Sequence, residues 1–289
     1  MENYITVKVK VSCPRERAWC LWTDPRHIVR WNNASDDWHT PHAENDLRSG
    51  GQFLYRMEAR DGSMGFDFTG RYTMVELYER IDYTMDDGRK VSILFEADGD
   101  ETTVTEHFEP ESENSVELQQ AGWQAILNNF MNYADSFEKP VRMHFERMIE
   151  APAMKVYQIM LEDSKYREWT KVFNPASHFK GTWEMGSRIH FIGTGENGES
   201  GGMVSLVEEN IPGEFVSLRH LGILKNGMEI YTCSETESWA GLHENYSFRE
   251  VDGKTLLLID TDAIAGFEAY FNETWPKALD ILKTFSETT

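Results

Sequence analysis

The sequence lacks the features that mark many functional classes. It has three cysteines in 289 residues and no Cys-x-x-Cys pair, too few for the disulfide frame of a small secreted scaffold. No apolar run is long enough to cross a bilayer. The N-terminus alternates polar and apolar residues and does not carry the continuous apolar stretch of a signal peptide. We therefore expect a cytoplasmic protein.

Positive charge is also scarce. Lys and Arg number 28 against 49 Asp and Glu, and the net charge is −21. Both halves of the chain are acidic, so they would repel the phosphates of nucleic acids and the surfaces of anionic membranes. We expect neither of these as a partner, and the simplest role of the charge is to keep the protein in solution.

Motifs of known catalysts and cofactor sites are missing as well. There is no GxSxG elbow, no Walker loop and no HExxH, and the glycine-rich GTGENGESGG stretch lacks a strand–GxGxxG–helix context. His39 and His42 lie in a segment that contains Pro41 and reads as a loop, with no third ligand nearby, so we expect no metal and no cofactor. Surface positions are expected for three histidines of the second half, His190, His220 and His243.

The chain does contain an internal repeat. Residues 13–32, CPRERAWCLWTDPRHIVRWN, share a pattern with residues 151–170, APAMKVYQIMLEDSKYREWT. Pro14 matches Pro152 and Trp31 matches Trp169, both at a spacing of 138. A period of about half the chain predicts two tandem domains, residues 1–139 and 140–289, each large enough for its own core.

Hydrophobic periodicity gives the same order of elements in both halves. A strand is followed by a helix that starts at Pro14, breaks at Asp24-Pro25 and resumes as a second short helix. Short alternating strands separated by Asp-Gly turns come next and indicate an antiparallel meander. One long helix with an apolar stripe closes the half, and its Trp123 corresponds to Trp275 of the second half.

Two features distinguish the second half. Extra residues around 218–243 predict an inserted or extended hairpin that the first half lacks. Pro276 lies within the closing helix, where a proline has no amide hydrogen and clashes with the carbonyl four residues back. We therefore expect this helix to kink, or to end and begin again, near residues 272–276.

This order of elements describes the helix-grip architecture. It is an α+β fold in which a curved antiparallel sheet wraps around a long C-terminal helix, with the order β-α-α-β-β-β-β-β-β-α in each domain. The stretches ENDLRSGGQFLYRMEARDGS, FDFTGRYTMVELYERIDYTMDDGR and GWQAIL resemble the START-like superfamily, also called SRPBCC, which includes the birch-pollen-allergen fold. Within it, residues 1–139 resemble the bacterial branch named after the activator of heat-shock-protein-90 ATPase. The second half is a more divergent copy.

The resemblance implies a hydrophobic cavity between the sheet and the long helix. Members of the superfamily bind lipids, aromatic compounds or polyketides there, some transform their ligand, and some are co-chaperones. In-phase aromatic residues are the expected lining of the first cavity: Trp31, Phe53, Tyr55, Phe66, Phe68, Tyr72 and Trp123. The corresponding candidates in the second domain are Trp169, Phe191, Phe271 and Trp275.

Glu106 is the sharpest polar candidate. It shares a strand face with Val104 and Phe108, so alternation points it inward. A carboxyl group facing an apolar cavity has a raised pKa, which is how a general acid or base is made. The alternative is a structural role, in which a register slip turns Glu106 outward or a salt bridge with Arg56 or Arg71 holds it.

Three functions fit these expectations. The first is the binding or sensing of an apolar or aromatic small molecule, which needs only the apolar lining. The second is a polyketide-cyclase-like enzyme in which Glu106 or a cavity tyrosine transfers a proton. The third is a co-chaperone-type module with a chaperone as its partner, which rests on family analogy alone. We favour binding over catalysis.

Overall fold

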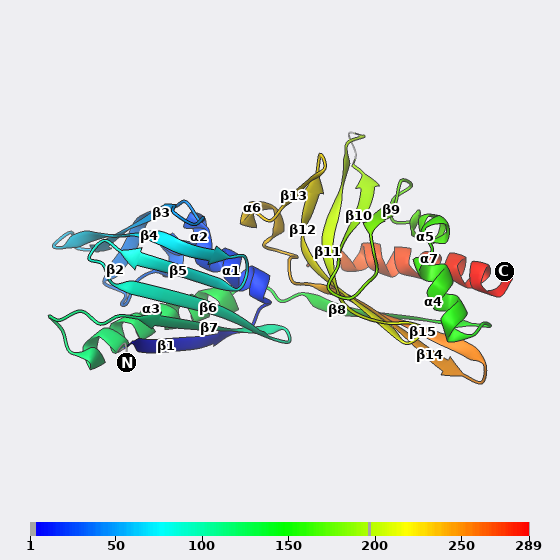
Figure 1. Ribbon diagram of the computed structural model, residues 1–289, viewed down its shortest axis with the longest axis horizontal. Helices are drawn as coiled ribbons and strands as arrows, with labels where there is room; N and C mark the ends of the chain where they lie inside the picture. The colour runs from blue at the N-terminus through cyan, green and yellow to red at the C-terminus, as the bar shows by residue number, and fades with distance from the viewer. Residues whose placement is uncertain (1–3, 196–197, 289) are drawn as a thin grey trace. The chain divides into compact units, whose positions relative to one another are not determined.

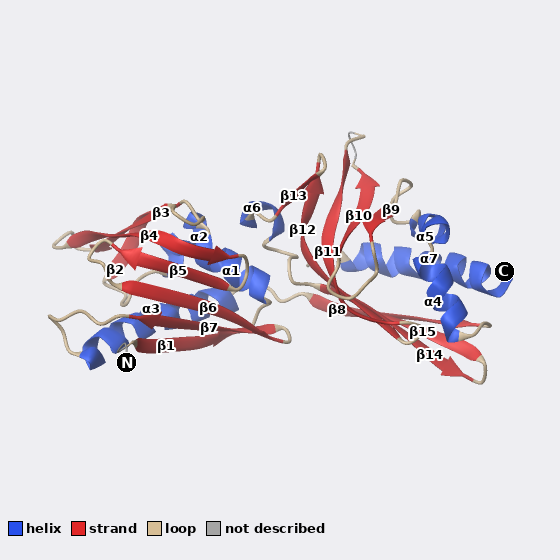
Figure 2. Cartoon of the chain, viewed as in Figure 1, coloured by secondary structure: helices blue, strands red, loops and turns tan. Residues whose placement is uncertain are grey.

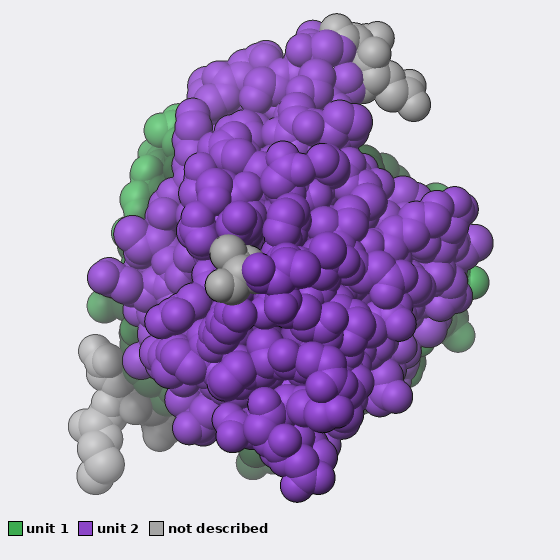
Figure 3. Space-filling model, turned by 90° about the vertical axis from the view of Figure 1, so that its right-hand side faces the viewer, with its two compact units in different colours: residues 1–138 green, residues 139–289 purple. Residues whose placement is uncertain are grey.

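The computed structural model describes residues 4–195 and 198–288. The chain divides into two compact units, which we call unit 1, Met1–Glu138, and unit 2, Lys139–Thr289 (Figure 3). Each unit has its own antiparallel sheet and ends with a long helix (Figures 1 and 2). The expected α+β class and the tandem helix-grip architecture are confirmed, because each sheet that the described residues form is built from strands of one unit.

Unit 1 begins with a strand and two short helices, continues with six strands and ends with a helix. Its elements are β1 (Ile5–Val11), α1 (Arg15–Thr23), α2 (Pro25–Trp31), β2 (Trp38–Asn45), β3 (Gln52–Ala59), β4 (Gly65–Glu76), β5 (Arg80–Met85), β6 (Lys90–Asp98), β7 (Glu101–Phe108) and α3 (Val116–Asp135).

Local sequence explains the breaks between the helices of unit 1. Asp24 caps α2 by accepting a hydrogen bond from the backbone N–H of Arg26, and Pro25 occupies the first helical position, where its missing amide costs nothing. Ser115 caps α3 through a 3.2 Å hydrogen bond from the N–H of Leu118. These caps explain why α2 begins directly after α1 as a separate helix, and why α3 begins at Val116.

The sheet of unit 1 has the strand order β1-β7-β6-β5-β4-β3-β2. Consecutive strands are neighbours except that β1 joins β7, so β7 lies inside the sheet. Val7 and Ile93 stand on either side of Glu106 in the register of the three strands. Burial alternates along β7, and Glu106 shares the buried face with Val104 and Phe108. The predicted inward direction of Glu106 is what the structure shows.

Unit 2 repeats this order with two additions. Its elements are β8 (Val141–Ile149), α4 (Ala153–Leu161), α5 (Asp163–Thr170), β9 (His178–Gly181), β10 (Arg188–Thr194), β11 (Ser200–Ile211), β12 (Phe215–Lys225), β13 (Met228–Ile230), α6 (Cys233–Thr236), β14 (His243–Val251), β15 (Lys254–Ala263) and α7 (Glu268–Thr288). The described strands are ordered β8-β15-β14-β12-β11-β10-β9, and β13 pairs with β12.

The additions are β13 and α6. An Asn226-Gly227 turn, with positive φ at both residues, joins β12 to β13, as expected for a tight hairpin. The hairpin expected around 218–243 is present, but its second strand is short. The strand ends at Ile230, and the chain then forms the short helix α6.

Two further expectations need correction. The segment around Pro41 is a strand and not a loop. It tolerates proline because β2 is an edge strand, and its pairing with β3 is irregular between His39 and His42. Helix α7 runs through Pro276 as one helix, so the expected division is wrong, while the kink stays a prediction. The contacts of its apolar stripe continue on both sides of the proline, at Trp275 and Leu279.

Three hydrogen bonds occur at corresponding places in the two units. The N–H of Ser12 donates to the carboxylate of Asp135 at 2.7 Å, and the N–H of Glu150 donates to that of Glu287 at 2.8 Å. Trp31 and Trp169 each donate their indole N–H to the carbonyl of a residue in the preceding helix, Leu21 and Met160. Thr102 and Thr255 each donate their hydroxyl to the carbonyl of a residue just after the first strand, Cys13 and Ala151. These bonds occupy equivalent places in the two units.

Candidate functional site

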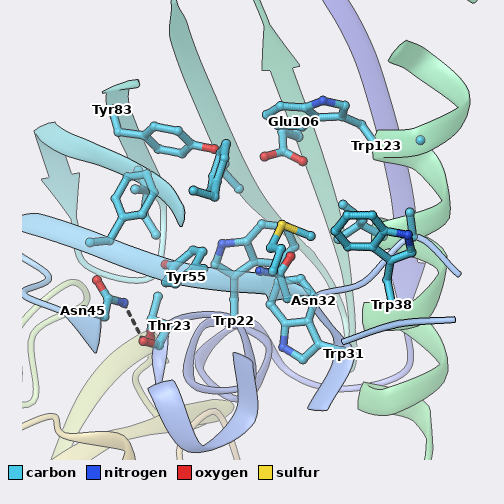
Figure 4. Close-up of a pocket in the computed structure, with 18 of the residues that line it drawn as sticks. Trp22, Thr23, Trp31, Asn32, Trp38, Asn45, Tyr55, Tyr83, Glu106 and Trp123 are labelled. Atoms are coloured by element: carbon cyan, nitrogen blue, oxygen red, sulfur yellow. Dashed lines mark hydrogen bonds between the residues drawn. The ribbon is translucent and has the colours of Figure 1, made fainter. Parts of the chain in front are cut away.

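A cavity of about 360 Å³ lies within unit 1, in the size range of small-molecule sites. Its walls come from α1 and α2, from strands β2 to β7, and from α3. All seven residues expected to line it do so: Trp31, Phe53, Tyr55, Phe66, Phe68, Tyr72 and Trp123. The expectation missed further lining residues, among them Trp22, Thr23, Asn32, Trp38, Asn45 and Tyr83. Figure 4 shows these side chains gathered around one space.

Phe53 is at the centre of one wall. Its ring centroid lies 5.0 Å from that of Tyr55, 5.3 Å from Tyr72 and 4.9 Å from Tyr83. The ring covers Gly70 on β4, where an added Cβ would come within 2.7 Å of Phe53 Cζ. A larger side chain at position 70 would therefore displace the Phe53 ring or the neighbouring strand.

Tryptophans form the opposite side of the cavity. Trp22 lies 4.8 Å from Trp31 between ring centroids, and both contact Phe130 of α3. Trp123, also from α3, stacks on Phe108 at 4.0 Å with an interplanar angle of 12°. Each ring is held by at least one other ring, so the apolar wall is fixed in shape before any ligand arrives.

The cavity reaches solvent on the side of β2 and β4. Trp38 and Phe66 lie there with ring centroids 6.0 Å apart, and Phe66 is 48% exposed. This edge provides the access that a small molecule needs.

Polar groups line one wall as a chain of hydrogen bonds. The hydroxyl of Tyr72 donates to Asn45 Oδ1 at 2.7 Å, and Asn45 Nδ2 donates to the carbonyl of Thr23 at 2.6 Å (Figure 4). The hydroxyls of Tyr55 and Tyr72 are 3.4 Å apart. Burial raises the pKa of Tyr55 to about 12 and holds those of Tyr72 and Tyr83 well above the usual value of a phenol, so all three phenols are neutral hydrogen-bonding groups.

Glu106 is 4% exposed, and desolvation raises the pKa of its carboxyl to about 8. The proposed salt bridges to Arg56 and Arg71 are wrong. Arg56 pairs with Glu58 and Asp67, and Arg71 donates to the carbonyl of Gly50. Within the described residues, the Glu106 carboxyl has neither a hydrogen-bond partner nor an ion pair, and it projects into the cavity (Figure 4).

The candidates of unit 2 have different surroundings. Trp169 and Trp275 belong to the hydrophobic core, with 2% and 3% exposure, and Phe191 and Phe271 pack against that core. A ligand-binding role for these four residues stays a prediction. Unit 2 also has a carboxyl with a raised pKa that we did not predict, because burial raises the pKa of Glu244 on β14 to about 7.

Comparison with known proteins places unit 1 in a family. The family model described as activator of Hsp90 ATPase homolog 1-like protein matches residues 12–135. The AHSA1-like protein from Aeromonas hydrophila is 44% identical over 46% of this chain and 93% of its own, with a TM-score of 0.45. A protein from Cytophaga hutchinsonii is 52% identical over 45% of this chain and 91% of its own, with a TM-score of 0.42. The chain belongs to the activator of Hsp90 ATPase homolog 1-like family through its first unit.

Some solved structures span both units. The di-domain ARO/CYC StfQ from the steffimycin biosynthetic pathway covers 98% of each chain at 14% identity, with a TM-score of 0.40. At this identity and TM-score the likeness says nothing about activity. None of the curated proteins compared with the chain matches it. Over the described residues, no helix is long and apolar enough to cross a membrane.

Proposed function

We propose that unit 1 binds an aromatic or apolar small molecule in its cavity, and that the protein is a cytoplasmic carrier or sensor of that molecule. One observation supports this above all others. A cavity of about 360 Å³ is walled by aromatic rings, opens to solvent beside Phe66, and has the carboxyl group of Glu106 directed into it. Fixed apolar walls with few polar groups are typical of small-molecule sites.

The test is to fill the cavity without disturbing its walls. Gly122 of α3 lines the cavity, and a Cβ added there meets no atom within 4 Å. Gly122→Leu should therefore fold, with a helix at least as stable as before, and occupy the space that the ligand needs. Ala121→Leu is the matched control, because Ala121 is the exposed neighbour on the same helix.

Binding is measured with the neutral fluorophore N-phenyl-1-naphthylamine, whose emission rises in apolar surroundings. We expect saturable binding to the parent protein and to Ala121→Leu, and at least about tenfold weaker binding to Gly122→Leu, a loss of about 1.4 kcal/mol. Equal binding by all three would place the probe elsewhere and contradict the proposal. Circular dichroism verifies that both variants fold.

Glu106 supports a second candidate, an enzyme that uses proton transfer. Its raised pKa, about 8, keeps it protonated at neutral pH, as a general acid must be. It also interacts electrostatically with Tyr55 and Tyr83. In this case Glu106→Gln abolishes conversion of a compound that still binds in the cavity, whereas unchanged conversion would remove Glu106 as the acid.

A further inference from the structure

The cavity of unit 1 is aromatic and, among the residues described, has no cationic side chain in its lining. Among its lining residues in the described chain there is no lysine, arginine or histidine, and Glu106 is the sole carboxyl. The whole protein carries a net charge of −21. The field of the protein and the composition of the cavity therefore both oppose an anionic ligand.

The Glu106 carboxyl is buried without compensation. On either side within the sheet it meets Val7 of β1 and Ile93 of β6. Trp123 faces the cavity from α3, and Tyr55, Tyr72 and Tyr83 face it from β3, β4 and β5. None of these side chains carries a positive charge, and the three phenols stay neutral. A buried carboxylate costs free energy unless a cation pairs with it.

The rings around Glu106 supply the second half of a cation site. Figure 4 shows the carboxyl directed into a space bounded by Tyr83, Trp22 and Trp123. Faces of tryptophan and tyrosine attract cations through the ring quadrupole, most strongly where water is excluded. A carboxyl and several aromatic faces around one space are chemically complementary to an organic ammonium group.

We infer that the ligand of this cavity is an organic cation, a protonated amine on an aromatic or apolar body. Its ammonium group lies against the Glu106 carboxylate and its body lies among the rings of Phe53, Phe68 and Trp31. This inference rests on the proposed binding function and adds to it the charge of the ligand.

The inference has a pH signature. In the ligand-free protein the Glu106 carboxyl holds its proton below about pH 8. A cation binds the ionised form, so binding below that pH displaces a proton, and affinity rises with pH. A neutral ligand that accepts a hydrogen bond shows the opposite trend, because it binds the protonated form and loses its donor above about pH 8.

The experiment compares two probes of nearly equal shape, 2-naphthylethylamine and 2-naphthylethanol, by titration calorimetry on the full chain. The amine stays charged throughout, because its pKa is close to that of lysine, about 10.4. From about pH 6 to about pH 8 we expect the affinity for the amine to rise by up to about tenfold per pH unit. The affinity for the alcohol should not rise.

Glu106→Gln keeps the shape of the side chain and removes its charge. It should weaken amine binding at about pH 8 by roughly 10- to 100-fold, abolish the pH dependence, and leave alcohol binding within about threefold. Glu96→Gln removes a charge of the same sign from an exposed position on β6 and should change neither. This control separates local pairing from the general charge of unit 1.

The outcomes separate the two proposals. The inference of a cationic ligand is wrong if the alcohol binds at least as tightly as the amine above pH 8, or if Glu106→Gln binds the amine as the parent does. The proposed binding function stands in either case. If the cavity-filling Gly122→Leu variant leaves the binding of both probes unchanged, or neither probe binds, the binding function itself fails, and the inference fails with it.

Discussion

The position that holds a carboxyl group in unit 1 holds an apolar side chain in unit 2. Val7 pairs with Glu106, and Phe145, 138 residues after Val7, pairs with Ile259. On the other side Ile93 pairs with Glu106, and Tyr246 pairs with Ile259. Glu106 therefore corresponds to Ile259, which is fully buried.

Larger side chains surround Ile259 than surround Glu106. Phe145 and Tyr246 replace a valine and an isoleucine, and both contact the ring of Trp275, at centroid distances of 5.9 and 6.4 Å. Glu244, on the neighbouring strand β14, is a carboxyl of unit 2 whose pKa burial raises. The comparison teaches that one fold keeps its clamping hydrogen bonds while one inward position changes from a carboxyl that faces a cavity to an apolar side chain within a hydrophobic core.

The largest effect should come from the charge of Glu106. The folded carboxyl has a pKa of about 8, and an unfolded glutamate ionises near 4.3. Between these values the folded state binds more protons, so the stability of unit 1 falls as pH rises. Glu106→Gln should remove this loss and raise the free energy of unfolding at about pH 9 by as much as about 4 to 5 kcal/mol.

Urea unfolding of the full chain at about pH 4, 7 and 9 checks this prediction. The gain should be small at the lowest pH. If the free energy of unfolding changes with pH in the same way in the variant and in the parent, Glu106 is not the buried ionisable group that we describe.

The second comparison truncates the matched tryptophans. Trp169→Ala removes a ring from the core of unit 2 and should cost about 3 to 5 kcal/mol. Trp31→Ala should cost less, because one side of Trp31 already faces a cavity. Unfolding in urea gives both losses. Probe binding should weaken in Trp31→Ala alone, and weakening in Trp169→Ala would place a site in unit 2.

His220 should make unit 2 sensitive to acid. Burial lowers its pKa to about 4, and Ser205 Oγ lies 2.9 Å from its Nδ1. An unfolded histidine has a pKa near 6.5, so between these values the unfolded state binds more protons and stability rises with pH. The gain is at most about 3 kcal/mol. In acid unfolding curves, His220→Gln should make the free energy of unfolding depend less on pH. An unchanged dependence would mean that other groups cause it.

The smallest effects should be equal in the two units. Asp135→Ala and Glu287→Ala each remove the carboxylate that accepts a hydrogen bond from the start of the unit. Each should cost about 1 kcal/mol, the usual net value of one hydrogen bond. Glu117→Ala on the exposed side of α3 is the control. A loss of stability in one unit only would show that the two bonds correspond in position but not in their contribution to stability.

Much of the fold could be predicted because periodicity is a local signal. The spacing of Trp31 and Trp169 revealed the repeat, and alternation in β7 gave the direction of Glu106. Features that depend on contacts with other strands or helices could not be predicted from local periodicity. Pro41 suggested a loop because its place at the edge of the sheet is decided by β3, and Pro276 suggested a broken helix because packing on both sides of it is not visible in the sequence.

The site was predicted in part for the same reason. Tyr83 could have been found, since Ile81, Tyr83 and Met85 alternate with polar residues on β5. Trp38 could not, because its strand was read as a loop. We expected His220 at the surface, but it is buried. It pairs opposite Ser205 on β11, and no local pattern in the sequence predicts this pairing.

The bond from Ser12 to Asp135 has a consequence for synthesis. Its two ends are separated by 123 residues, and β1 must wait for β7 before it gains a neighbour. A nascent chain that leaves the ribosome therefore holds β1 unpaired until almost the whole of unit 1 has emerged, and such long-range contacts slow folding. Since the bond from Glu150 to Glu287 repeats the arrangement, we expect each unit to close once, when its own last helix leaves the tunnel. A translational pause at the point where residue 138 has left the tunnel would give the first unit time to close before β8 offers a competing edge.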